Sequence, residues 1–144
     1  MTTALAERSW CVVVPHHARG ARAARHRIAG ELADVVPAAL LSDLVAVVGE
    51  LVGNAIRHAD PLPGGVVRVA WRLRRGTDTE SVQVRVTDGG AGGRTPNSRP
   101  AGPYAVDGRG LHIVGALATR WGVDRDGLGQ SVWAELTSSA VPAA

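Results

Sequence analysis

The chain has 144 residues, which is the size of one domain with a core of its own. Its single cysteine, Cys11, excludes an internal disulfide framework and a cysteine-rich zinc site. The net charge is +3 and all 16 basic residues are arginine, so the missing lysine excludes a Walker A phosphate loop and Schiff-base chemistry.

Aromatic content and hydropathy exclude further classes of protein. Aromatic residues make up 3% of the chain, too few for a stacking platform that binds single-stranded nucleic acid. No segment of about 18 residues is free of charge, so we expect no membrane-spanning helix. The first residues lack a basic segment followed by a hydrophobic one, so we expect no signal peptide and a cytoplasmic protein.

The first part of the chain predicts a strand, two helices and a hairpin. The apolar run at 9–14 is short and ended by proline, which indicates a strand. Apolar residues recur at spacings of three and four over 18–36, which predicts an amphipathic helix. A broad apolar face predicts a second helix over 38–59. Alternating apolar and polar residues predict strands at 66–75 and 81–88, paired as a hairpin.

The second part predicts a long loop, a helix and two strands. Segment 89–110 is dense in glycine and proline and has almost no apolar side chains, so we expect a loop over a site. Apolar spacing predicts a helix over 111–122, and 123–136 predicts two strands about a tight turn. This order of elements is typical of a two-layer α/β sandwich, in which helices cover one face of a mixed, mostly antiparallel sheet.

A polar pair interrupts the apolar second helix. Glu50 and Asn54 are four residues apart, so their side chains project side by side, about 40° apart around the helix and about 6 Å apart along it. Burying both in an apolar core without partners would cost several kcal/mol. They must therefore face solvent, another polar group or a ligand, and the ordinary solvent edge of an amphipathic helix is the alternative to a site.

Two glycine-rich segments accompany this pair. Asp88 ends a predicted strand, and its carboxylate can accept a hydrogen bond from an amino group such as that of adenine. Gly90 and Gly92 follow it and let the backbone approach a flat ring or a phosphate. Gly108 and Gly110 bring backbone N–H groups to the start of a helix, where phosphate binds well. Each motif alone is compatible with a surface turn or a helix cap, but together and in this order they indicate a nucleotide site.

Four segments carry a resemblance to a known group of proteins. They are ELVGNAIRHA (50–59), TDGGAGG (87–93), GRGLHIVGALATRWG (108–122) and GQSVWAEL (129–136). With them the chain resembles the GHKL ATPase superfamily, and within it the anti-sigma-factor serine/threonine protein kinases of bacteria. The resemblance implies a single ATP-binding domain of the Bergerat fold over 9–137, an ATP lid over 93–107, and flexible tails at 1–8 and 138–144.

The resemblance implies a role for each matching residue in binding ATP and Mg²⁺. Asn54 would bind the Mg²⁺ that bridges the phosphates, and Glu50 would be the general base. Asp88 would contact the adenine amino group, and Ser131 would support that contact through water. The other nucleotide-binding residues implied are Arg57, His58, Gly90, Gly92, Gly108, Arg109, Gly110 and Leu111. For His58, an interaction with the helix dipole is the alternative.

Three functions stay open at this point. The first is a protein kinase that inhibits a sigma factor and phosphorylates a serine of an antagonist protein. The second is a non-catalytic ATP-binding regulator that changes partners with its nucleotide, and the retained Glu50 favours the first over it. The third is the catalytic domain of a histidine kinase, because segment 25–36 is similar to a phosphoacceptor helix. Ala33 stands where that helix would carry its histidine.

The resemblance also implies partners. We expect a sigma factor, an anti-sigma-factor antagonist and a second copy of the chain, and no direct contact with nucleic acid. The cluster Arg19, Arg22, Arg25 and Arg27 could meet an acidic surface of a sigma factor. A solvated helix face is the alternative for these arginines.

Overall fold

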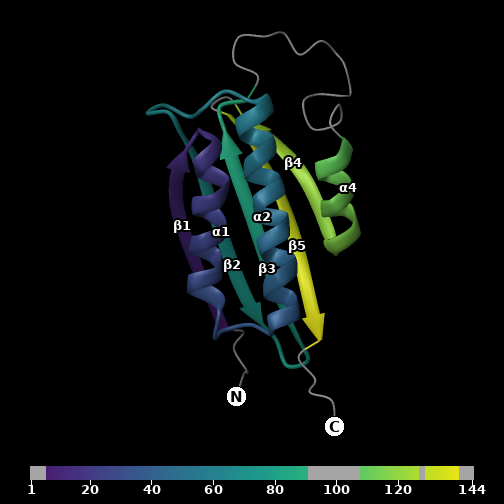
Figure 1. The fold of residues 1–144 in the computed structure, drawn as a ribbon. Helices are drawn as coiled ribbons and strands as arrows, with labels where there is room; N and C mark the ends of the chain where they lie inside the picture. The colour runs from purple at the N-terminus through teal and green to yellow at the C-terminus, as the bar shows by residue number, and fades with distance from the viewer. Residues whose placement is uncertain (1–5, 91–107, 127–128, 140–144) are drawn as a thin grey trace.

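Five strands and three helices make up the part of the chain that the computed structural model describes, residues 6–90, 108–126 and 129–139. The elements are β1 (Ala6–Pro15), α1 (Ala18–Leu32), α2 (Ala38–His58), β2 (Val66–Arg75), β3 (Thr79–Asp88), α4 (Gly108–Leu117), β4 (Arg120–Asp126) and β5 (Gly129–Ser139). The strands form one sheet in the order β1-β2-β3-β5-β4, and each neighbouring pair is antiparallel. The predicted two-layer α/β sandwich is confirmed (Figure 1).

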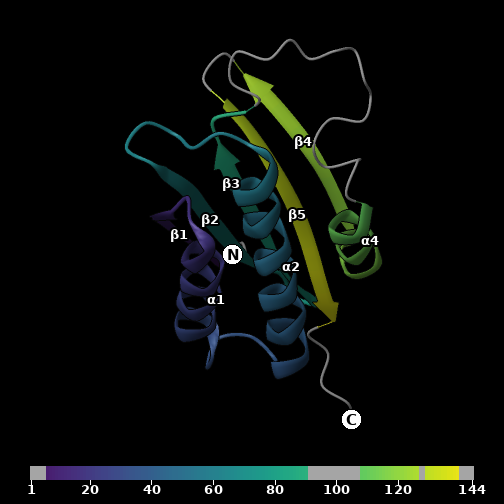
Figure 2. The same ribbon diagram turned by 45° about the horizontal axis from the view of Figure 1, so that its top comes forward.

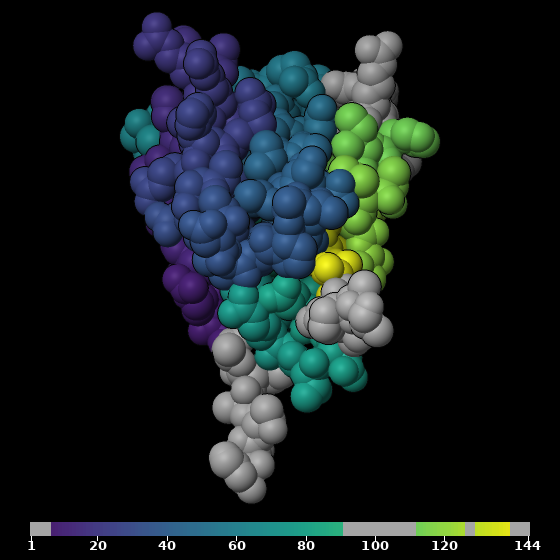
Figure 3. All heavy atoms as spheres, turned by 60° about the horizontal axis from the view of Figure 1, so that its bottom comes forward, coloured from purple at the N-terminus to yellow at the C-terminus, as the bar shows by residue number. Residues whose placement is uncertain are grey.

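The helices form one layer against one face of the sheet. Figure 2 shows α1, α2 and α4 on the same side of the strands. In Figure 3, α2 lies between α1 and α4. The sheet face against the helices is called the covered face below, and the opposite one the open face. On β3, Val84 lies on the covered face and Arg85 on the open face, because side chains alternate along a strand.

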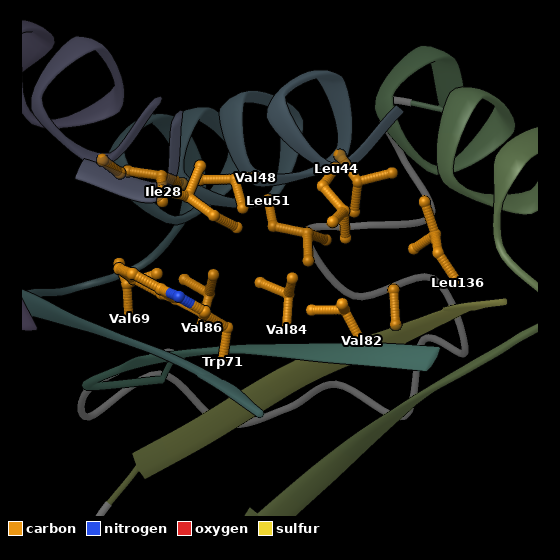
Figure 4. Close-up of a cluster of buried hydrophobic side chains, with 14 of the residues drawn as sticks. Ile28, Leu44, Val48, Leu51, Val69, Trp71, Val82, Val84, Val86 and Leu136 are labelled. Carbon is orange, nitrogen blue, oxygen red and sulfur yellow. The ribbon is translucent and has the colours of Figure 1, made fainter. Parts of the chain in front are cut away.

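The core lies between the covered face and the helices α1 and α2. Buried residues alternate with more exposed ones along β2 and β3, as the two-residue period of a strand requires. Figure 4 shows side chains of both layers pointing toward one another, Ile28, Leu44, Val48 and Leu51 from the helices and Val69, Trp71, Val82, Val84, Val86 and Leu136 from the strands. Each such burial contributes about 1.5–3 kcal/mol, so these contacts hold the two layers together.

Helix α2 is the centre of the helix layer. By length and composition it is the one helix in the described residues that is apolar enough to cross a membrane, with a mean hydropathy of 1.7. Its eight buried residues and its place against the sheet account for that hydropathy. Its C-terminal end is capped from the turn between β1 and α1: Nε2 of His16 lies 3.1 Å from the carbonyl oxygen of Ala55 and 2.7 Å from that of Ala59, and donates to them.

The first helix and the ends of the chain differ from the prediction. α1 ends at Leu32, earlier than the helix predicted over 18–36, and the N–H groups of Val35 and Val36 turn back to the carbonyl oxygen of Leu32. β1 begins at Ala6 and β5 continues to Ser139, so parts of both expected tails are strand. Pairing with the neighbouring strands β2 and β3 lengthens both of them.

The helix predicted over 111–122 is wrong at both ends. α4 spans Gly108–Leu117, and β4 begins at Arg120. Trp121 pairs with Ala134 of β5 inside this strand. Sheet pairing therefore overrides the helical spacing of the apolar residues, as tertiary context often does.

Candidate functional site

The turn after α2 is bonded to the end of β3. The N–H of Asp60 donates to the carbonyl oxygen of Gly90 at 2.9 Å, and the N–H of Gly89 donates to that of Asp60 at 2.8 Å. Gly90 has a φ of 77°, and a Cβ on Gly89 would lie 2.3 Å from the carbonyl oxygen of Pro61. Both positions therefore require glycine. This glycine turn fixes the end of α2 beside the end of β3.

Asn54 is buried on the side of α2 that faces away from α1. Its exposure is 0%, and its Oδ1 accepts a hydrogen bond from Nη2 of Arg57 at 2.7 Å. Its Nδ2 has no hydrogen-bond partner among the described residues. Ile56 packs near Gly20 of α1 and lies roughly 160° around the helix from Asn54. Figure 3 shows α4 on the other side of α2 from α1. The helical positions of Asn54 and of the half-buried Glu50, one turn earlier, therefore place both on the side of α2 toward α4.

Asp88 is the last residue of β3 and has 0% exposure. It is two and four residues from the buried Val86 and Val84 along the strand, so its side chain lies on the covered face with theirs. Its Oδ1 accepts a hydrogen bond from the N–H of Gly90 at 2.7 Å, which is an Asx turn that orients the carboxylate. A carboxylate thus follows the apolar side chains of Val82, Val84 and Val86 on the covered face, beside the end of the helix that carries Asn54.

Gln130 is the neighbour of Asp88 on the adjacent strand β5, and no sequence motif marked it. It pairs with Asp88 in the β3–β5 register and is 5% exposed. Its Oε1 accepts a hydrogen bond from Nε of Arg125 at 2.8 Å, while its Nε2 has no partner among the described residues. A buried donor left unsatisfied costs about 1–3 kcal/mol. The two unsatisfied amides, on α2 and on β5, therefore indicate that this end of the molecule takes a polar ligand or ordered water.

The model of the histidine kinase-like ATPase domain matches residues 14–136 of the chain. The chain belongs to this family. The match supports its place in the GHKL ATPase superfamily, whereas the curated proteins contain no match to the chain. The matched range includes all of α2, β3 and α4 and the start of β5, which are the elements that build the candidate site.

In this histidine kinase-like ATPase domain, Ser131 does not lie with Asn54 and Asp88. Its neighbours Gln130 and Val132 are buried on the covered face, so Ser131 points to the open face. There its Oγ lies 2.8 Å from Oγ1 of Thr87, at hydrogen-bond distance. Ser131 was expected to support the adenine contact, but the residue on the covered face is its neighbour. A match of residue types does not decide on which face of a strand a side chain lies. Gln130 holds the covered-face position.

The second glycine segment begins α4. The backbone of residues 108–111 forms the first turn of this helix, and α4 starts at the end of the ATPase domain where α2 and β3 end (Figure 1). The phosphate contacts implied for Gly108, Arg109, Gly110 and Leu111 stay predictions. Gly92 and the lid segment 93–107 lie outside the described residues, as do the side chains of Arg109 and Leu111.

The last turn of α2 carries the two other residues that the sequence singled out. Arg57 is exposed, and its guanidinium folds back over Gly53, where a Cβ would lie 3.1 Å from Nη1. The missing side chain at Gly53 is what lets this guanidinium reach Asn54. His58 is half-buried, and the bonds to the carbonyl groups at the end of the helix come from His16.

The residues present fit a Mg²⁺ held mainly by phosphate and water. Within the described parts of the ATPase domain, no group of three or more His, Cys, Asp or Glu residues could hold a metal ion. Asn54 offers one buried amide oxygen, which is a hard ligand of the kind that Mg²⁺ takes alongside substrate phosphates. Arg57 donates to this same oxygen, so the oxygen that would bind the cation is already hydrogen-bonded to a guanidinium.

Proposed function

We propose that this domain binds ATP with Mg²⁺ at the end of the sheet where α2, β3 and β5 meet. One observation carries the proposal: two polar side chains with 0% exposure, Asn54 and Asp88, lie at the same end of the molecule. The backbone bonds between Asp60 and residues 89 and 90 hold them there. A few convergent polar groups beside an apolar core are typical of a small-molecule site.

Each of these side chains has a distinct task in the proposal. Asp88, oriented by the N–H of Gly90, accepts a hydrogen bond from the adenine amino group. Asn54 holds Mg²⁺ through Oδ1. When bound, Mg²⁺ and ATP supply the phosphoryl group and neutralise the charge that develops on it. Glu50 lies one turn before Asn54 and accepts the proton of the attacking hydroxyl group.

The finer proposal is an anti-sigma regulatory factor. In it, the domain is a cytoplasmic serine/threonine protein kinase that sequesters a sigma factor, phosphorylates an anti-sigma-factor antagonist and acts as a homodimer. Two features support it. Glu50 is half-buried beside Asn54, where a kinase needs its base, and α1 presents Arg19, Arg22 and Arg27 as exposed side chains that suit an acidic protein surface.

A non-catalytic, ATP-dependent regulator is the second candidate. The observation that favours it is the bond from Arg57 to Oδ1 of Asn54, since the proposed metal ligand is already paired with a cation. Such a site must break this bond before Mg²⁺ binds. Slow or weak loading with Mg²⁺ suits a nucleotide-dependent switch of partners better than repeated turnover.

Calorimetry with ATP and Mg²⁺ tests the proposed binding. For Asp88→Asn we expect an affinity about 10–100 times lower than that of the parent, because a hydrogen bond to a buried charged group is lost. The matched control is Asp124→Asn, the same substitution on an exposed open-face residue whose side chain is 59% exposed, and it should bind ATP as the parent does. Equal affinities for all three proteins would remove Asp88 from the site.

Transfer of label from γ-labelled ATP tests the kinase. Proteins captured from the native cell in the presence of ATP and Mg²⁺ are incubated with the parent protein or with Glu50→Gln. We expect label on a serine of a captured protein with the parent only, while the variant still binds ATP. Binding of ATP by both proteins without label transfer by either would support the regulator instead.

A further inference from the structure

We propose that Gln130 reads the nucleobase beside Asp88. Its Nε2 donates a hydrogen bond to N1 of adenine, and this makes the site prefer adenine over guanine. The inference rests on the proposed binding of ATP and assigns a specificity-determining residue to that same site. Three observations carry it: the position of Gln130 in the sheet, the fixed orientation of its amide, and a buried donor without a partner.

The position of Gln130 places its side chain next to that of Asp88. The two residues are direct partners in the antiparallel register of β3 and β5. Both are buried on the covered face, with exposures of 5% and 0%. In such pairs the two Cβ atoms are about 5 Å apart, close enough for both side chains to contact one planar ring. The backbones also approach closely, since a Cβ on Gly129 would lie 2.3 Å from the carbonyl oxygen of Asp88.

Arg125 decides which way the amide of Gln130 points. Its Nε lies 2.8 Å from the Oε1 of Gln130. A guanidinium has only donors, so the atom that it contacts must be the amide oxygen. The amide nitrogen therefore occupies the other position, and its two N–H groups point away from Arg125. The orientation follows from the chemistry of the partner and needs no further assumption.

The amide nitrogen of Gln130 has no acceptor in the described protein. Three buried side-chain atoms in the described residues lack a hydrogen-bond partner, Asn54 Nδ2, Trp71 Nε1 and Gln130 Nε2. Trp71 stands in the middle of the apolar core, whereas the two amides lie at the proposed site. Buried donors in native proteins are nearly always satisfied. A ligand that carries an acceptor at this place completes the hydrogen bonding of Gln130.

The pair of side chains complements the edge of adenine. Adenine presents an amino donor next to the acceptor N1, while guanine presents the acceptor O6 next to an N1–H donor. An ionised carboxylate only accepts hydrogen bonds, and an amide nitrogen only donates. Asp88 and Gln130 thus present an acceptor beside a donor, which matches adenine and opposes guanine at both positions.

Nucleotide analogues test the contact without changing the protein. Affinities of the parent for ATP, GTP and 1-deaza-ATP, in which a C–H group replaces N1, are measured by calorimetry with Mg²⁺. We expect 1-deaza-ATP to bind about 10 times more weakly than ATP, because the donor of Gln130 then loses its acceptor. We expect GTP to bind more weakly still, because both of its edge groups are mismatched.

The variant Gln130→Glu assigns the contact to this side chain. It keeps the shape of the side chain and an acceptor for Arg125 but replaces the donor by an acceptor. We expect ATP to bind about 10 times more weakly than to the parent, and the difference between ATP and 1-deaza-ATP to disappear. Gln83→Glu is the matched control, since it makes the same change on the half-buried open face of β3 and should leave all affinities unchanged.

The outcomes separate this inference from the proposal beneath it. If the parent binds ATP and 1-deaza-ATP equally, Gln130 does not contact N1. If the difference between them persists in Gln130→Glu, water or backbone makes the contact and the inference is overturned. In both cases ATP binding stands. Failure of the parent to bind any adenine nucleotide overturns the proposed function together with the inference.

Discussion

Two polar clusters interrupt the apolar covered face of the sheet, one at each end. In the first, Glu80 is 7% exposed and accepts a hydrogen bond from Nε of Arg75 at 2.5 Å, and Arg75 also donates to the carbonyl oxygen of Val35. In the second, Gln130 is 5% exposed and Asn54 is fully buried, and each amide nitrogen lacks a partner in the described residues. Each cluster contains a buried polar side chain, but the clusters differ in whether the protein satisfies its hydrogen-bonding groups.

This difference separates a structural role from a binding role. The Arg75–Glu80 cluster ties the segment after α1 to the sheet through Val35, so its polar groups are used within the fold. In the cluster of Asn54, Asp88 and Gln130, the two amide nitrogens have no hydrogen-bond acceptor among the described residues. A buried donor without an acceptor does not stabilise a fold. The two unsatisfied amides therefore support our proposal that the ligand binds at this end of the sheet.

Breaking the Arg75–Glu80 cluster should have the largest effect on stability. Arg75→Met keeps the apolar stem but leaves the carboxylate of Glu80 and the carbonyl group of Val35 without their donor. We expect the free energy of unfolding in urea to fall by about 1–3 kcal/mol. The side chain of Arg75 is 41% exposed, so water reaches the site and keeps the loss below that of a fully buried pair. The affinity for ATP should be unchanged.

Arg74→Met is the matched control for that variant. Arg74 is the neighbouring residue on the open face and pairs with Glu7 at 3.2 Å, with side-chain exposures of 51% and 45%. An exposed ion pair contributes about 0–1 kcal/mol, so the loss should be smaller than for Arg75→Met. Equal losses, or a fall in ATP affinity with Arg75→Met alone, would contradict the structural role of this cluster.

Removing an unsatisfied amide should change stability less than Arg75→Met does, and in the opposite direction. For Asn54→Leu without nucleotide, we expect the free energy of unfolding to stay the same or rise by up to about 1 kcal/mol, because an apolar side chain replaces a buried donor without a partner. Arg57, the partner of Oδ1, is exposed and can be solvated instead.

The same variant should lose its response to nucleotide. The melting temperature of the parent should rise with ATP and Mg²⁺, since a ligand that binds only the folded state stabilises it. That of Asn54→Leu should not rise, because the variant lacks the amide oxygen for Mg²⁺. A large loss of stability without nucleotide would mean that Asn54 serves the fold, and the contrast between the two clusters would fail.

The sequence predicted the helix and sheet layers well because apolar residues recur regularly along their helices and strands. Alternation over 66–75 gave the bounds of β2, and the apolar face over 38–59 gave α2 to within one residue. The boundary between α4 and β4 failed because Trp121 and its neighbours satisfy a helical spacing but pair with β5. The spacing of apolar residues within one segment cannot predict its pairing with a strand that follows later in the sequence.

The site was predicted from motifs. A motif identifies the type of residue at a position, but it does not show on which face of a helix or strand the side chain lies. Asn54 and Asp88 are both fully buried, and the bonds between Asp60 and residues 89 and 90 join the end of α2 to the end of β3. Their roles in binding a nucleotide stay predictions. The buried Val132, Ala134 and Leu136 alternate along β5, and this pattern already assigns Gln130 to the covered face and Ser131 to the open face. The pairing of Gln130 with Asp88 depends on the register of β5 against β3, which no local pattern contains. The cap of α2 by His16 was missed for a similar reason, because the residues lie 39 and 43 positions apart in the chain.

The smallest expected effect tests the register on which the ligand-binding cluster depends. Ser131→Ala removes the hydrogen bond to Thr87 on the half-buried open face, so we expect a loss of about 0.5 kcal/mol in stability. Calorimetry should find the ATP affinity within about twofold of the parent, since a side chain on the open face does not reach the site. A tenfold loss would indicate that β5 is shifted by one residue against β3. Because such a shift turns every side chain of a strand to the other face, it would also remove Gln130 from the covered face.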